Sequence, residues 1–101
     1  MVSNSVIRLC AVGDVALGGT INPKEGWTVE GCCDPDILAQ LRLSDITFAN
    51  LDCTFDCSGS PLDPDEYLIS APAEQLHILD DLGLDVVSQA NNHSMDYGGE
   101  A

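Results

Sequence analysis

The order of apolar and polar segments is the feature that most constrains what this chain can fold into. Three apolar runs, within residues 5–14, 45–52 and 84–91, are separated by two segments with helical spacing. Runs that are rich in β-branched and apolar residues are typical of strands buried on both faces, and their alternation with helices is typical of a parallel sheet. The sequence therefore predicts one α/β domain spanning residues 1–101, with the order β-α-β-α-β and a small parallel sheet.

Both helical segments carry start or stop signals. In residues 34–45, Asp34 is placed to cap the helix and Pro35 lies in its first turn. In residues 72–83, Gly83 is placed to end the helix. Each segment has an apolar stripe, predicted as Ile37, Leu38 and Leu41 in the first and Leu76, Leu79 and Leu82 in the second. Residues 18–33 and 53–67 are rich in turn formers and are predicted as loops, and a short extended piece is expected at residues 67–71.

The charge of the chain excludes one class of partner. Asp and Glu number 17 against 3 Lys and Arg, giving a net charge of −14. Nucleic-acid binding needs clustered Lys and Arg, so it is excluded, whereas divalent cations are compatible with this charge. No apolar run approaches the length of a membrane span, and the first residues lack a signal peptide's basic start and long apolar stretch. We therefore expect a cytoplasmic protein without a membrane segment.

The five cysteines do not form a recognisable framework. They are Cys10, Cys32, Cys33, Cys53 and Cys57. An odd number fits a complete disulfide set poorly, and no CxxC pair repeats at zinc-site spacing. Reduced thiols are the favoured interpretation, with Cys10 as a small buried apolar residue.

Polar side chains gather where the predicted strands end. Asp14 follows the first strand, Asn50 and Asp52 close the second, and the third is followed by Asn91, Asn92 and His93. The carboxyl ends of parallel strands meet at one edge of a sheet, which is where open α/β sheets bind ligands. The sequence thus predicts a site at this edge.

Carboxylate, amide and imidazole groups together suit Mn, Zn, Fe or Mg. Two such metals can hold a phosphoryl group, and a neighbouring histidine can protonate a leaving oxygen. The pairs Gly13-Asp14 and Asn50-Leu51-Asp52 are also common in ordinary turns, so neither is specific alone. Asp96 is expected to orient His93 or to cap a following helix, and His77 is expected to be a packing or surface residue.

Three motifs in this order resemble the CapA family, the poly-γ-glutamate capsule-biosynthesis proteins related to calcineurin-like metallophosphatases. They are "GDVALGG" at residues 13–19, "ANLD" at 49–52 and "ANNHSMDYG" at 90–98, and "APAEQLHILDDLGLDVVSQ" at 71–89 is also similar. The resemblance implies a partial metallophosphatase-like sandwich with one or two divalent metals. It departs from the family pattern at Asp52, where Glu is usual, and in length, because family members have a later half with further histidine motifs.

The resemblance also implies roles for individual residues. The implied metal ligands are Asp14, Asp52 and Asn92, the implied catalytic residue is His93, and the residues implied behind them are Asn50, Asn91 and Asp96. We expect the chain to be the amino-terminal half of such a domain, inactive alone and completed by the missing carboxyl-terminal half, by another chain or by homo-oligomerisation. Three functions stay open: a metal-dependent phosphoesterase in the complete domain, a non-catalytic metal- or polymer-binding component of capsule synthesis, and an inactive fragment. Family members are often membrane-anchored.

Overall fold

A parallel three-stranded sheet forms the centre of the structure, a computed structural model that describes residues 5–18, 26–55 and 69–97. Its strands are β1 (Leu9–Val15), β2 (Ile46–Leu51) and β5 (Val86–Ser88), in the order β1-β2-β5. The predicted α/β class and parallel sheet are confirmed. The predictions for residues 19–25, 56–68 (with Cys57) and 98–101 lie outside the described residues.

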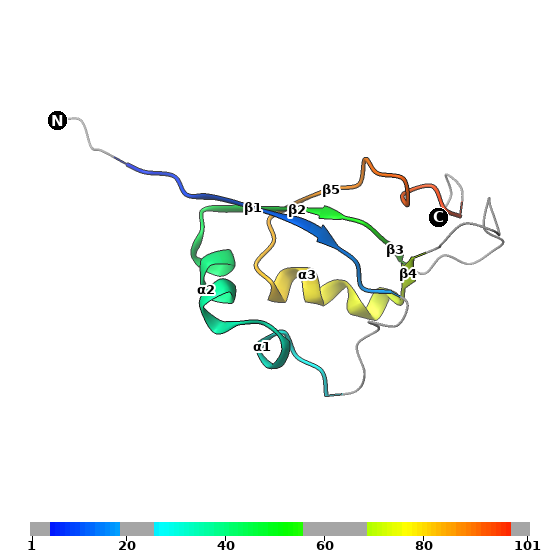
Figure 1. Cartoon of the computed structure of the whole chain (residues 1–101), viewed down its shortest axis with the longest axis horizontal. Helices are drawn as coiled ribbons and strands as arrows, with labels where there is room; N and C mark the ends of the chain where they lie inside the picture. Colours follow the sequence, from blue (N-terminus) through cyan, green and yellow to red (C-terminus); the bar gives the residue numbers. More distant parts are fainter. Residues whose placement is uncertain (1–4, 19–25, 56–68, 98–101) are drawn as a thin grey trace.

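Helices cover one face of this sheet, as Figure 1 shows. They are α1 (Val29–Cys32), α2 (Pro35–Leu43), the 3₁₀ helix η2 (Ala73–Leu76) and α3 (His77–Asp81). A second small parallel pair joins β3 (Thr54–Phe55) to β4 (Ser70–Ala71). None of the helices in the described segments is long and apolar enough to cross a membrane.

The predicted start of α2 is confirmed in detail. Asp34 Oδ1 accepts hydrogen bonds from the backbone N–H groups of Asp36 (2.9 Å) and Ile37 (3.2 Å), and Pro35 opens the helix. Such a cap satisfies N–H groups that have no partner inside the helix. At the other end, the fully buried Thr47 of β2 donates its hydroxyl to the Leu41 carbonyl at 2.6 Å, which joins the helix to the sheet.

Alternation along β2 shows which side chains face the helices. Thr47, Ala49 and Leu51 are buried, whereas the residues between them, such as Phe48, are more exposed. The core below the sheet contains Leu17, Leu51, Cys53, Ala71 and Ile78, with Val87 of β5 packed against it.

The opposite face of the sheet is also apolar but is not covered by the described residues. Leu9 pairs in register with Ile46, and Phe48 pairs with Val86. Leu9, Ile46 and Val86 are 69%, 42% and 51% exposed, respectively. We call this surface the open sheet face. A sheet with apolar side chains on both faces is typical of a middle layer in a larger fold.

Both predicted apolar stripes are partly wrong. Leu38 and Leu41 are buried, but Ile37 is 57% exposed and so lies outside the buried stripe of α2. In the second helix, Ile78 is buried with Gln75, while Leu76 is 46% exposed. The first turn here is 3₁₀, with three residues per turn, so the buried positions are shifted from those expected for an α-helix.

Two short elements lie inside regions predicted as loops. One is α1, in which the Thr28 hydroxyl oxygen accepts from the Gly31 N–H at 3.2 Å, and the other is β3.

Arg42 of α2 connects α1 to α3, donating from Nη2 to Glu30 Oε1 (2.7 Å) and from Nε to the Asp81 carbonyl (2.8 Å). These contacts join residues far apart in the sequence, so local patterns did not indicate them.

Candidate functional site

The carboxyl ends of the strands place several predicted site residues side by side. Asp14 is the sixth residue of β1 and pairs in register with Asn50 of β2, which pairs with Ser88 of β5. The β1–β2 register shifts between Ala11 and Asp14, where β1 has one residue more than β2. A bulge of this kind re-aims the side chains that follow it.

Hydrogen bonds link three of these residues across the strands. Asn50 Nδ2 donates to Asp14 Oδ1 at 2.8 Å, and Asn91 Nδ2 donates to Asn50 Oδ1 at 3.1 Å. We call the Asp14–Asn50–Asn91 set the amide bridge. It connects the end of β1, through β2, to the turn that follows β5.

Asn91 also organises the turn in which it lies. Its Oδ1 accepts from the backbone N–H groups of His93 and Ser94, each at 3.1 Å. Its Nδ2 donates in addition to the Leu51 carbonyl at 2.7 Å. A side-chain oxygen that accepts from the next residues of its own turn is a common way to fix an irregular backbone.

His93 is paired with Asp96 in the same turn. His93 Nδ1 lies 2.8 Å from Asp96 Oδ2, and the two residues are 9% and 4% exposed. A buried carboxylate on one ring nitrogen fixes the orientation of the imidazole. The other carboxylate oxygen, Asp96 Oδ1, is buried without a hydrogen-bond partner in the described part of the chain.

The two remaining predicted ligands also lie at this edge, but they are less constrained. Asp52 directly follows β2, is half-buried, and donates its backbone N–H to the Val15 carbonyl at 2.9 Å. Asn92 lies in the turn after β5 and is exposed. Across residues 5–18, 26–55 and 69–97, no three His, Cys, Asp or Glu side chains converge closely enough to hold a metal ion. His77, expected to be a packing or surface residue, is exposed on α3 and contacts the Glu74 carbonyl.

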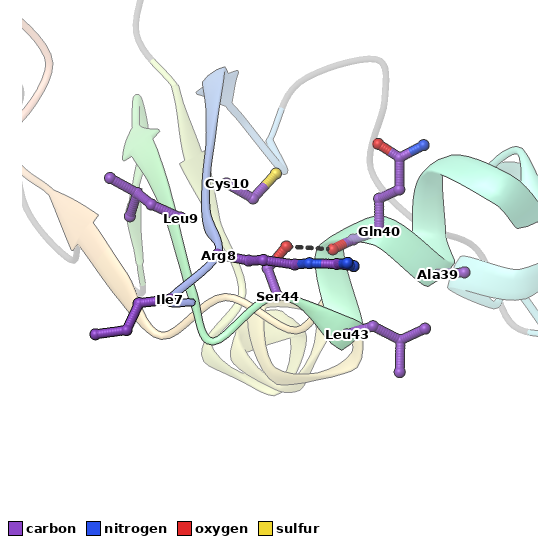
Figure 2. Close-up of a pocket in the computed structure, with 8 residues that line it drawn as sticks. All are labelled: Ile7, Arg8, Leu9, Cys10, Ala39, Gln40, Leu43 and Ser44. Carbon is purple, nitrogen blue, oxygen red and sulfur yellow. Dashed lines mark hydrogen bonds between the residues drawn. The ribbon is translucent and has the colours of Figure 1, made fainter. Parts of the chain in front are cut away.

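The described cations lie at the other end of the sheet. Arg8 precedes β1, and Arg42 lies in the last turn of α2, which ends just before β2 begins. Figure 2 shows Arg8 extending toward Gln40 of α2 in a hollow of about 610 Å³. Among the described residues, the carboxyl edge therefore has the carboxylates of Asp14, Asp52 and Asp96 and no Lys or Arg to balance them.

A smaller hollow of about 260 Å³ adjoins the turn after β5. It is lined by Leu51, Cys53, Thr54, Phe55, Gln89 and Ser94. Burial raises the pKa of the Cys53 thiol, so this cysteine is a protonated apolar group rather than a nucleophile. Gln89 and Ser94 were not singled out from the sequence, although Ser94 directly follows His93 in the most specific motif.

Comparisons with known proteins give a family but no individual relative. Neither curated proteins nor solved structures include a match to the chain. A family model described as "Bacterial capsule synthesis protein PGA_cap" matches residues 8–101, a span that contains all the site residues described above. The resemblance to capsule-synthesis proteins is thereby confirmed, and the chain belongs to the bacterial capsule synthesis protein family PGA_cap.

Proposed function

We propose that the carboxyl edge of the sheet binds a divalent metal, and that the chain contributes this site to a metal-dependent phosphoesterase-like domain of capsule synthesis. The observation that carries the proposal is the amide bridge. It holds the Asp14 carboxylate in one place at an acidic edge that has no described Lys or Arg. A fixed carboxylate without a cationic neighbour is suited to a bound metal ion.

The donor atoms at this edge fit Mn, Zn, Fe or Mg. Asp14 Oδ1 is engaged by Asn50, so Asp14 Oδ2 is the oxygen left to bind a metal. Asn92 and Asp52 are the other proposed ligands, because neither side chain has a hydrogen bond within the described residues. The side-chain oxygens of Asn50 and Asn91 already accept hydrogen bonds, so these two residues support the ligands rather than bind directly.

His93 is the proposed proton donor of the site. Asp96 holds its Nδ1, so a proton exchanged with a substrate would pass through Nε2. When bound, one or two divalent metals supply the positive charge that a phosphoryl group needs. The chain's own contribution is to hold the ligands and to orient the imidazole.

We further propose that additional polypeptide completes the site. His93 is the only imidazole among the proposed ligands and their neighbours, whereas a dinuclear centre commonly uses several nitrogen and oxygen ligands. The open sheet face is apolar and needs a covering layer. That layer could come from a carboxyl-terminal half, from another chain or from a second copy.

The second candidate is a component that binds metal or polymer without hydrolysis. It is supported by the description of the matching family, which names capsule synthesis and no hydrolytic reaction. Direct binding of an anionic polymer is disfavoured at this edge, because carboxylates without cations repel a polyanion. In this candidate too, a metal would have to mediate the contact.

Calorimetric titration with Mn²⁺ and Zn²⁺ tests the proposal. We compare the unmodified chain with Asp14→Asn, which removes the charge but keeps the shape, and with Asp36→Asn on α2 as the matched control. We expect binding that Asp14→Asn weakens at least tenfold, by loss of a charged ligand, and that Asp36→Asn leaves unchanged. His93→Ala should keep the metal while abolishing phosphoesterase turnover in the completed domain.

Binding that is indifferent to Asp14 would refute the metal site. Metal binding without turnover in the completed domain would favour the non-catalytic candidate. Turnover that survives complete metal removal would exclude the metal-dependent reaction.

A further inference from the structure

We propose that Asn91 is a positioning residue that controls the Asp14 carboxylate through Asn50. The turn after β5 and the end of β1 would then behave as one unit.

 Asn91 and Asp14 lie far apart in the sequence, so the link between them is long-range. The metal-binding consequence rests on the proposed function, whereas the positioning itself does not.

All four hydrogen-bonding positions of the Asn91 side chain are occupied. Its Nδ2 donates to Asn50 Oδ1 and to the Leu51 carbonyl, and its Oδ1 accepts from the His93 and Ser94 N–H groups. An amide side chain offers two donors and two acceptor positions, so none is left for a ligand. Asn91 therefore acts only through the residues that it holds.

The orientation of the Asn50 amide follows from that of Asn91. Because Asn91 presents an N–H group, Asn50 must turn its oxygen toward Asn91 and its nitrogen toward Asp14. The opposite orientation would place two donors together at one end and two acceptors together at the other. Only this orientation of the Asn50 amide satisfies both hydrogen bonds of the amide bridge. It engages Asp14 Oδ1 and leaves Oδ2 available to the proposed metal.

The substitution Asn91→Asp tests the donor role of the Asn91 side chain separately from its acceptor role. An aspartate keeps the oxygen that accepts from His93 and Ser94, so the turn is retained. It replaces the donor by a second oxygen, which faces the acceptors Asn50 Oδ1 and Leu51 O. Gln89→Glu is the matched control, since it adds the same charge two residues away on an exposed side chain outside the amide bridge.

Two measurements on the full chain test the proposal. The first follows the Asn50 side-chain N–H₂ resonances by ¹⁵N NMR without metal. We expect Asn91→Asp to shift them and Gln89→Glu to leave them in place. The second is Mn²⁺ affinity, which we expect Asn91→Asp to weaken by about tenfold, as is typical when a residue behind a metal ligand is changed.

A double-mutant comparison distinguishes positioning from general destabilisation. In an Asn50→Ala background, Asn91→Asp should have no further effect on Mn²⁺ affinity, because the connection to Asp14 is already broken. Equal effects with and without Asn50 would overturn the proposal, as would Asn50 resonances that Asn91→Asp leaves unmoved. If the unmodified chain binds no Mn²⁺, the proposed function fails, but the resonances still decide whether Asn91 positions Asn50.

Discussion

Replacing Gly83 by alanine should destabilise the fold through two separable effects. Gly83 ends α3 with a φ of 81°, a conformation that residues with a Cβ adopt at a cost. A Cβ at this position would also lie 3.0 Å from both Cα and Cγ of Arg42, and the Cα belongs to the backbone of α2. The new methyl group would therefore push α2 and α3 apart.

The expected size of the loss can be built from these two effects. The left-handed conformation costs about 1–2 kcal/mol for a residue with a Cβ, and overpacking costs about 1–3 kcal/mol. Alanine has less conformational freedom than glycine in the unfolded chain, and this offsets about 0.4–1 kcal/mol of the loss. We expect Gly83→Ala to lower the free energy of unfolding by about 2–3 kcal/mol, a central value within that range.

Gly26 provides a control in which only the first effect operates. Its φ is 82°, but nothing lies within 4 Å of a Cβ built there. Gly26→Ala should therefore lower the free energy of unfolding by about 1 kcal/mol, which is the conformational cost less the unfolded-state gain. Urea unfolding followed by far-UV circular dichroism gives both values. Equal losses in the two variants would refute the inferred crowding between Gly83 and Arg42.

Two further predictions concern pH. The hydrogen bond from Arg42 lowers the pKa of Glu30 below 4.5, so the stability from this pair is present above that pH and is lost as the pH falls through the lowered pKa. The urea midpoints of the unmodified chain and Glu30→Gln should therefore differ at neutral pH and converge in acid; a constant difference would contradict the assignment. Burial raises the pKa of the Cys53 thiol above 9.0, so stability should fall as the pH rises past that value, and Cys53→Ala should reduce the fall. In mass spectrometry after iodoacetamide treatment, the exposed Cys32 should react before Cys53, and the reverse order would contradict the burial.

The sequence predicted the features that depend on local chemistry. Asp34 and Pro35 mark the start of α2 because capping involves neighbours in the chain, and Gly83 marks the end of α3 for the same reason. The parallel sheet followed from apolar runs that alternate with helical segments. Topology then sufficed to predict that Asp14, Asn50 and Asn91 would meet at one edge.

The features that the sequence did not predict depend on longer-range geometry. The stripe through Leu76 was wrong because a 3₁₀ turn opens the helix, and no residue there distinguishes it from an α-helical turn. The contacts of Arg42 with Glu30 and Asp81 depend on how three helices pack. Similarly, the motif gave Asn91 a supporting role but not its hydrogen-bond partners, which include the backbone at the end of β2.

The strand order β1-β2-β5 also has a consequence for how the protein is made. Neighbours in the sheet follow one another in the order of synthesis, so each strand can join the previous one without an earlier pair having to separate. The chain leaves the ribosome amino terminus first, so β1 and β2 emerge before β5. Asn91 lies after the last of these strands, and its bond to Asn50 can form only when β5 has docked. The amide bridge would thus close late in folding, and a nascent chain that had not yet docked β5 would present Asp14 without its support.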